Sequence, residues 1–208
     1  MPTNSAARLP RRFADLAVVA VPRPVPGPDE LLVRSRAIAV NPLDVVKQST
    51  GDLMYGWLPY PTVLGEDVAG EVVEIGRAVT RFAPGDRVIA YAVGMEKGRD
   101  NAAEGAFQEY VVVREVLTAP IPDALGWAEA CVLPLAVSTA ATALFQDDQL
   151  GLRHPTEATG TTTAATATAG TATGAGEPTG EAVVVWGGST SVGSNAIQLA
   201  RAAGYDVV

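Results

Sequence analysis

Glycines and hydroxyl side chains are concentrated in one short segment near the end of the sequence. The run is Gly187, Gly188, Ser189, Thr190, Ser191, Val192 and Gly193. A phosphate needs bare backbone at a helix N-terminus, where free N–H groups and the helix dipole favour negative charge. Aligned as G-x-G-x-x-G, the segment has Thr190 in place of the middle glycine, and the three hydroxyls could donate to phosphate oxygens instead. The pattern predicts a nucleotide-phosphate loop, and a tight structural turn is the alternative.

The elements expected on both sides of this loop favour the phosphate interpretation. Residues 182–186, AVVVW, are a continuous apolar run typical of a strand buried on both faces in a parallel sheet. The following helix has one apolar face, made of Val192, Ala196, Leu199, Ala200 and Ala203. Gly204 is placed to end that helix, and residues 205–208 begin a second strand. Together these elements predict the opening unit of a dinucleotide-binding fold.

Composition and charge exclude several classes of function. The 208 residues include 15 basic and 23 acidic side chains, a formal net charge of -8, which gives no general attraction to nucleic acids or anionic membranes. The apolar runs are shorter than the roughly 20 residues that span a bilayer, so no membrane partner is expected. The single cysteine, Cys131, cannot form a disulfide within the chain and is expected to be buried. We expect a cytoplasmic protein.

The rest of the sequence divides into a β-rich part, a helical stretch and a low-complexity segment. Short runs at 31–40, 68–76, 87–91 and 107–113, separated by glycine and proline, predict a small barrel or sandwich. Residues 127–145 change to helical character. Between 156 and 180 threonine, alanine and glycine dominate, which predicts a linker or surface insertion, with a threonine-rich strand as the alternative. The expected domains are 1–150, a linker at 151–181, and 182–208.

Six segments, in order, match one known family. They are PGPDELLVRSRAIAVNPLD, YPTVLGEDVAGEVVEIG, RFAPGDRVIAY, GAFQEYVVV, LPLAVSTAATALF and VVVWGGSTSVGSNAIQLARAAGYDVV. On these motifs the chain resembles the medium-chain dehydrogenase/reductase superfamily, within it the zinc-free branch of quinone oxidoreductases and the trans-acting enoyl reductases of polyketide synthesis. The resemblance implies a fold of α+β and α/β parts: a GroES-like β-barrel domain followed by the truncated start of a Rossmann parallel sheet.

The same resemblance bears on zinc. Zinc-dependent members of the superfamily place a cysteine near the position of Asn41 and a histidine directly after the glycine that matches Gly65, where this sequence has Glu66. A catalytic zinc needs three protein ligands, and two of the expected ones are missing. The only histidine, His154, lies beside the low-complexity segment, where a solvated surface position is expected. No metal ligands are therefore assigned.

The resemblance also implies roles for individual residues. Asn41 would lie near the substrate and the nicotinamide, and a turn residue that ends a strand with Pro42 is the alternative. Thr139 falls where relatives contact the nicotinamide carboxamide. Tyr55 and Tyr60 are candidate donors of the proton that completes a reduction. They could instead form the wall of an apolar pocket with Met54 and Trp57, with water supplying the proton.

The implied activity is transfer of a hydride from NADPH, with NAD not excluded, to an enone, a quinone or an enoyl thioester. A homodimer of the full-length protein is compatible with the resemblance. A complete dinucleotide domain has about six parallel strands, so we expect this sequence to stop before that domain is complete. The alternative function is a catalytically inactive GroES-like binding or accessory module, or a truncated fragment without activity. Gly70, Gly76 and Asp86 are interpreted as determinants of the fold.

Overall fold

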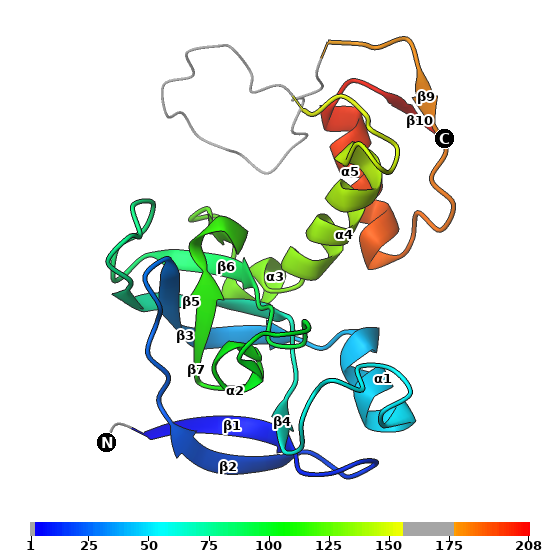
Figure 1. Cartoon of the computed structure of the whole chain (residues 1–208). Coiled ribbons are helices and arrows are strands. Elements are labelled where there is room, and N and C mark those ends of the chain that lie inside the picture. Colours follow the sequence, from blue (N-terminus) through cyan, green and yellow to red (C-terminus); the bar gives the residue numbers. More distant parts are fainter. Residues whose placement is uncertain (1–2, 156–176) are drawn as a thin grey trace. The chain divides into compact units, whose positions relative to one another are not determined.

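The computed structural model describes residues 3–155 and 177–208 (Figure 1). The chain forms two compact units, Met1–Leu135 and Ala136–Val208, and each is described by itself. Most of the segment expected to be a linker or insertion, residues 156–176, lies outside the described residues.

The first unit is built on two antiparallel sheets. The five-stranded sheet has the order β7-β3-β5-β6-β8, and the three-stranded sheet has the order β2-β1-β4. The strands are β1 (Thr3–Leu9), β2 (Ala17–Pro22), β3 (Glu30–Ala39), β4 (Thr62–Val63), β5 (Asp67–Ile75), β6 (Arg87–Tyr91), β7 (Tyr110–Arg114) and β8 (Thr118–Pro120). Three short helical segments lie between these strands, namely α1 (Pro42–Thr50), α2 (Asn101–Glu104) and the 3-10 turn η1 (Glu115–Leu117), and α3 (Trp127–Ala130) follows the last strand.

Buried apolar side chains form a hydrophobic core for each of the two sheets. One core cluster belongs to the large sheet and contains Leu31, Val33, Val68, Val72, Val88, Val111 and Val113. A second cluster, with Leu9, Leu58, Val63, Leu64, Met95 and Phe107, includes residues of β1 and β4. Close backbone approach requires glycine at two points, because a Cβ on Gly70 would lie 2.3 Å from the Arg34 carbonyl oxygen and one on Gly76 2.0 Å from that of Gly27. The interpretation of both glycines as fold determinants is confirmed.

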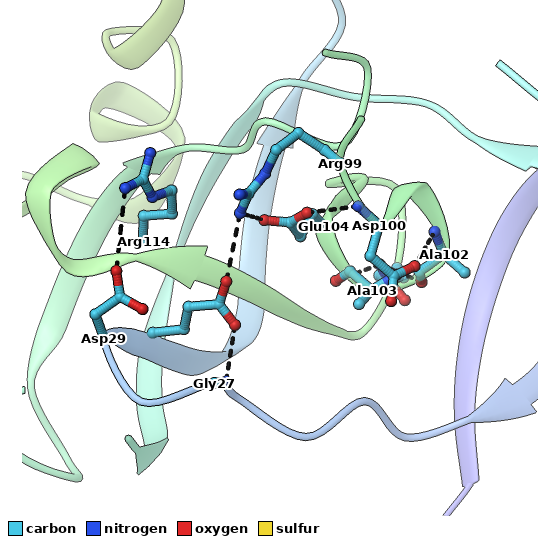
Figure 2. A network of polar contacts seen from close by, with 10 residues as sticks. Gly27, Asp29, Arg99, Asp100, Ala102, Ala103, Glu104 and Arg114 are labelled. Atoms are coloured by element: carbon cyan, nitrogen blue, oxygen red, sulfur yellow. Dashed lines mark hydrogen bonds and ion pairs between the residues drawn. The ribbon is translucent and has the colours of Figure 1, made fainter. Parts of the chain in front are cut away.

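Charged side chains fix the loops at one end of the large sheet (Figure 2). The Arg99 guanidinium forms ion pairs with Glu30, at 3.3 Å, and with the buried carboxylate of Glu104. Arg114 and Asp29 form a longer pair at 4.0 Å. These carboxylates are neutralised by arginine, so this network is structural.

The predicted strands agree closely with the observed ones, but some elements were not expected. The turn before β6 is closed by the Asp86 carboxylate, which accepts the Ala83 N–H at 2.8 Å as its turn role predicts. The last predicted strand, 107–113, begins later, at Tyr110. The hairpin of β1 and β2 and the helix α1 were missed, although Asn41-Pro42 followed by Asp44 is a typical helix start.

The second unit contains most of α4 (Pro134–Phe145), then β9 (Ala182–Val183), α5 (Ser191–Ala202) and β10 (Asp206–Val207). β9 and β10 pair in parallel, with α5 connecting them. Their core is formed by Leu144, Phe145, Ala200, Ala203 and Tyr205. Ala200 and Ala203, from the predicted apolar face of α5, lie in this core, so that face is confirmed at the end of the helix. Gly204, at a φ of 90°, terminates the helix as predicted.

One prediction for this unit is wrong. Residues 182–186 were expected to form a strand buried on both faces, but β9 ends at Val183, and Val184 and Trp186 are 73% and 98% exposed. The reason is that, within the described residues, β9 has a single partner strand, β10. A strand is buried on both faces only when neighbouring strands and helices cover it.

One stretch, Trp127–Phe145, is long and apolar enough to cross a membrane by length and composition. A core helix of a soluble protein passes the same test, so a single stretch of this kind is weak evidence for a membrane span. Here it is divided into α3 and α4 by a turn before Pro134. The sequence prediction had overlooked this stretch when it found no apolar run of sufficient length.

Candidate active site

Asn41 lies at the junction between β3 and α1, where the sequence explains the local structure. It is the N-cap of α1 with extended backbone angles, and Pro42 takes the first helical position, where its missing N–H costs nothing. The Asp44 carboxylate, one turn into the helix, accepts the Asn41 backbone N–H at 2.7 Å. The turn that the sequence predicted at Asn41 is therefore the start of helix α1. The side-chain amide nitrogen of Asn41 donates to a residue outside this helix.

That side chain is fixed by a buried carboxylate at the start of β5. Asn41 Nδ2 donates to Asp67 Oδ2 at 2.8 Å. The other oxygen, Asp67 Oδ1, accepts the backbone N–H of Leu135 in the first turn of α4 at 2.7 Å. A carboxylate is favoured at this position because a helix N-terminus attracts negative charge. Asp67 therefore connects the Asn41 side chain to the start of another helix.

Asp44 connects a third segment to this cluster. Its Oδ1 accepts the Gly65 N–H at 2.9 Å, so both of its oxygens receive backbone donors. Burial raises the pKa of Asp44, and the N–H donors from Asn41 and Gly65 oppose that rise. Burial likewise raises the pKa of Asp67, opposed by its bonds from Asn41 and Leu135. Both carboxylates are thus stabilised by fixed donors.

Glu66 directly precedes Asp67 in the sequence and has a different environment. The residue is 4% exposed, its Oε1 accepts the Tyr91 hydroxyl at 3.2 Å, and its Oε2 is buried with no hydrogen-bond partner among the described residues. Burial raises the Glu66 pKa to about 7, the negative charge of Asp44 adds to the rise, and the Tyr91 hydrogen bond opposes it. Glu66 is therefore a buried carboxyl that holds a proton up to neutral pH.

Tyr55 lies close enough to these carboxylates for their charges to act on it. Burial raises the pKa of its phenol, and the charges of Glu66 and Asp44 add to the rise. Its ring also meets Trp57 edge to face, with centroids 5.3 Å apart, and Trp57 Nε1 donates to the Met95 carbonyl at 3.0 Å. The structure thus supplies the aromatic contact expected of a pocket wall, and the negative charges of Glu66 and Asp44 oppose ionisation of the Tyr55 phenol.

Tyr60 belongs to a separate group around a buried lysine. Lys47, fully buried on α1, donates to Asp52 Oδ1 and to the Tyr55 carbonyl, both at 3.0 Å. Its ammonium lies 4.5 Å from the centre of the Tyr60 ring. The Lys47 hydrogen bond lowers the pKa of Asp52. This arrangement orders the loop that carries Tyr55 and Tyr60.

The glycine-rich loop lies between β9 and α5, as a phosphate loop requires (Figure 1). Gly187 has a φ of 85°, and a Cβ on Gly193 would lie 2.3 Å from the Gly187 carbonyl oxygen. Thr190 is the N-cap of α5: its hydroxyl accepts the Gly193 N–H at 3.0 Å and donates to the Gly187 carbonyl at 2.9 Å. That hydroxyl closes the turn, which leaves the exposed Ser189 and Ser191 as the hydroxyls able to face a phosphate.

The predicted site residues fall into two groups. Asn41, Tyr55 and Tyr60 lie in the first unit, around the carboxyl cluster and the loop after α1. Thr139, an exposed residue of α4, and the loop of residues 187–193 lie in the second unit. The geometry of this second group is compatible with binding of a dinucleotide pyrophosphate at the start of α5.

Sequence reasoning missed the cluster itself. Asp44, Glu66, Asp67 and Tyr91 were given no role, although Glu66 and Asp67 stand between apolar residues in the run VLGEDVAG. Two adjacent carboxyls at the start of an apolar strand are costly to bury without partners, which is a usable signal for a functional or capping role.

The donor atoms here do not suit a catalytic zinc. Asp44 and Asp67 use their oxygens as acceptors of hydrogen bonds, and residues 3–155 and 177–208 contain no group of three histidine, cysteine, aspartate or glutamate side chains placed to hold a metal. Cys131 is buried with its thiol donating to the Ala128 carbonyl at 3.3 Å, and His154 is exposed and stacks on Phe145. The expected positions of both residues are confirmed.

Two features of the fold indicate the class of protein. One is the antiparallel two-sheet unit with its buried polar cluster. The other is the parallel pair of strands joined through a glycine-rich loop and a helix. Residues 27–123 match the alcohol dehydrogenase GroES-like domain family. The chain has homologues in the medium-chain dehydrogenase/reductase superfamily, so the resemblance that its motifs implied is confirmed. The expected fold class is confirmed.

Named relatives share this assignment. Dehydrogenase pigH of Monascus ruber is 51% identical over 208 residues, all of this chain and 52% of that protein. Trans-enoyl reductase himH of Aspergillus japonicus is 42% identical over 179 residues, 86% of this chain and 45% of that protein. An alcohol dehydrogenase superfamily protein from Novosphingobium aromaticivorans, 28% identical, aligns with a TM-score of 0.74 over 99% of this chain and 52% of its own. The chain spans about half the length of these proteins.

One further relative bears on the metal. It is the zinc-binding alcohol dehydrogenase domain-containing protein cipB of Emericella nidulans, 38% identical over 98% of this chain and 50% of that protein. Its name describes a zinc-binding class, whereas this sequence has Asn41 and Glu66 at the two positions where zinc-dependent members of the superfamily place a cysteine and a histidine.

Proposed function

We propose that the complete protein is an oxidoreductase that uses NADPH, without zinc, to reduce an activated carbon–carbon double bond or a quinone. The substrate class is an enone, a quinone or an enoyl thioester. NADPH is preferred over NADH on the resemblance to the zinc-free branch. A cytoplasmic location fits the single reduced cysteine, and a homodimer fits the same resemblance.

The observation that carries this proposal is the chemistry of the cluster at the end of β3. Asn41 is held by Asp67 and by Asp44, and Glu66 stands where zinc-dependent relatives have a histidine. Without a Lewis acid, oxidation of an alcohol by the zinc route lacks its activating group. An acceptor conjugated to a carbonyl does not need one, because its own carbonyl delocalises the charge.

Names of relatives support the same class of reaction. Trans-enoyl reductase himH covers most of this chain at 42% identity, and two more proteins named trans-enoyl reductases, tndF and tazE, are 37% and 36% identical. The quinone oxidoreductase from Coxiella burnetii, at 24% identity and a TM-score of 0.67, supports the fold alone. The proposal therefore rests on the site for zinc independence and on the relatives for the substrate class.

The chain's own residues would contribute binding and orientation. The start of α5, with Gly187 and Gly193, would hold the pyrophosphate, assisted by the hydroxyls of Ser189 and Ser191. When bound, the reduced nicotinamide supplies a hydride. Asn41 would orient the substrate or the nicotinamide edge, and Thr139 would contact the carboxamide. The aromatic side chains of Tyr55 and Trp57 would exclude water from the reacting carbon.

The test uses the protein expressed from its complete reading frame. NADPH absorbance is followed with a panel of enones, quinones and enoyl thioesters, and NADPH binding is measured by fluorescence. The proposal expects NADPH consumption with at least one class. A cooperatively folded protein that neither binds nor consumes NADPH would instead support the binding or accessory module.

A further inference from the structure

Glu66 differs from the other two carboxyl groups of the cluster, Asp44 and Asp67, because only one of its oxygens has a hydrogen-bond donor among the described residues. Asp44 and Asp67 each receive donors on both oxygens. Glu66 receives one donor, the Tyr91 hydroxyl, and its buried Oε2 has no partner among the described residues. An unpaired buried oxygen costs stability, so its retention suggests a use in function.

We propose that Glu66 is the acid of the reductase, and that its Oε2 delivers the proton that completes reduction of the substrate. The inference rests on the proposed function and adds a catalytic residue to it. Its basis is the geometry of the cluster: Glu66 precedes Asp67, the residue that fixes the Asn41 side chain, and its free oxygen is the one not bonded to Tyr91. Tyr91 is a positioning residue, because it acts through Glu66.

Reduction of an enone or enoyl thioester then takes two steps. Hydride addition to the β-carbon moves the π electron pair to the carbonyl oxygen and forms an enolate. The O–H bond at Glu66 Oε2 then breaks, its proton adds to the α-carbon, and the electron pair remains on Glu66 as a carboxylate. The Tyr91 hydroxyl still donates to Oε1 and stabilises that anion. Glu66 regains a proton from solvent before the next turnover.

The groups around Glu66 favour its protonated form. Asp44 on α1, Asp67 on β5 and Glu96 after β6 all bring negative charge, and Tyr91 contributes the one hydrogen bond that favours the anion. Lys47, on the same helix as Asp44, is occupied by Asp52 and the Tyr55 carbonyl. A carboxyl that changes charge near neutral pH is better matched to proton transfer than the phenols, whose pKa values are raised further from neutrality.

The first test is kinetic, in the protein from its complete reading frame. Glu66→Gln keeps the shape and the acceptor for Tyr91 but has no acid proton. We expect kcat for NADPH oxidation with an enone to fall about 100-fold or more, and the loss of activity above neutral pH to disappear. The matched control is Glu71→Gln, the same substitution at a carboxylate of β5 that forms an exposed ion pair with Arg36 of β3. This variant should keep the wild-type rate and pH profile. Unchanged kinetics in Glu66→Gln would overturn the role.

The second test combines a further pH profile with a spectroscopic readout that does not depend on activity. Tyr91→Phe removes the hydroxyl that favours the Glu66 anion, so the basic limb of the pH profile should move to higher pH; an unmoved limb would overturn the role. Difference infrared spectroscopy of wild type against Glu66→Gln should show the carbonyl band of a protonated carboxyl below pH 7, and its absence would contradict the proposal. If the band is present but the wild type reduces no acceptor, the proposed function fails and the role fails with it.

Discussion

The Asn41 side-chain amide donates to Asp67 at 2.8 Å, and the same carboxylate accepts the backbone N–H of Leu135. A residue at the end of β3 is thereby tied to the start of β5 and to the first turn of α4. Asp67 is buried, and its two oxygens do different work: one orients the Asn41 side chain and the other accepts a free N–H at a helix N-terminus. The proposed orientation of a substrate by Asn41 depends on that bond.

Removal of the Asn41 amide should be costly for this reason. Asn41→Ala leaves Asp67 Oδ2 buried without its donor, and we expect a loss of about 1–3 kcal/mol in the free energy of unfolding. Asn41→Asp should lower the free energy of unfolding further at neutral pH, because two ionised carboxylates would face each other. Part of this loss should be recovered in acid, where one of the two carboxyl groups is protonated. Urea unfolding measures both, with Ser49→Ala on the exposed face of α1 as control. Equal stability of Asn41→Ala and the control would contradict the account.

The raised pKa of Glu66 predicts how stability depends on pH. The folded state binds this proton up to about pH 7 and the unfolded state releases it near 4.5, so the contribution of Glu66 to stability falls as pH rises through that window. Over the whole window the effect is on the order of 3 kcal/mol. Glu66→Gln should therefore gain stability relative to wild type between pH 5 and pH 8. A difference in unfolding free energy that is the same at both pH values would rule out the shift.

Lys47 should control the ionisation of Asp52. In Lys47→Met the pKa of Asp52 is expected to rise toward its ordinary value, because the hydrogen bond from Lys47 is the main cause of its depression. Arg12→Met, which removes a more exposed ion pair at 3.0 Å, should raise it less. Carbon-detected NMR titration of Asp52 reads both. A larger rise in Arg12→Met would reverse the assignment.

The start of α5 should not tolerate a side chain at Gly193. A Cβ there would lie 2.3 Å from the Gly187 carbonyl oxygen, so Gly193→Ala must displace the backbone that would hold the pyrophosphate. We expect NADPH binding to weaken by about tenfold or more, equivalent to ~1.4 kcal/mol. Fluorescence titration of the complete protein measures this, with Ser194→Ala on the exposed face of α5 as control. Binding unchanged in Gly193→Ala would place the cofactor elsewhere.

Local chemistry made much of the fold predictable. β6 was expected at residues 87–91 and is observed there, because the turn that ends in Asp86 fixes its start and its apolar residues alternate. Gly204 likewise ends the helix where it was expected to, and its φ is 90°. These features depend on neighbours in sequence.

Features that depend on distant partners were not predictable in the same way. The exposure of Trp186 depends on which strands lie beside β9, and the state of Glu66 depends on Asp44 and Tyr91, which are 22 and 25 residues away along the chain. Asn41 could be proposed from its motif, but its bond to Asp67 arises only when β3 and β5 pair in register, as Ala39 and Asp67 do. The carboxyl cluster is a product of that pairing.

The most direct test of the central claim is whether the proposed reductase activity depends on zinc. The complete protein is purified in the presence of a chelator, its metal content is measured, and NADPH oxidation with an enone is followed before and after addition of zinc. We expect full activity with negligible metal and no gain in activity when zinc is added. Activity lost on chelation and restored by zinc would contradict it, and would require metal ligands other than the carboxyl cluster around Asn41 and Glu66.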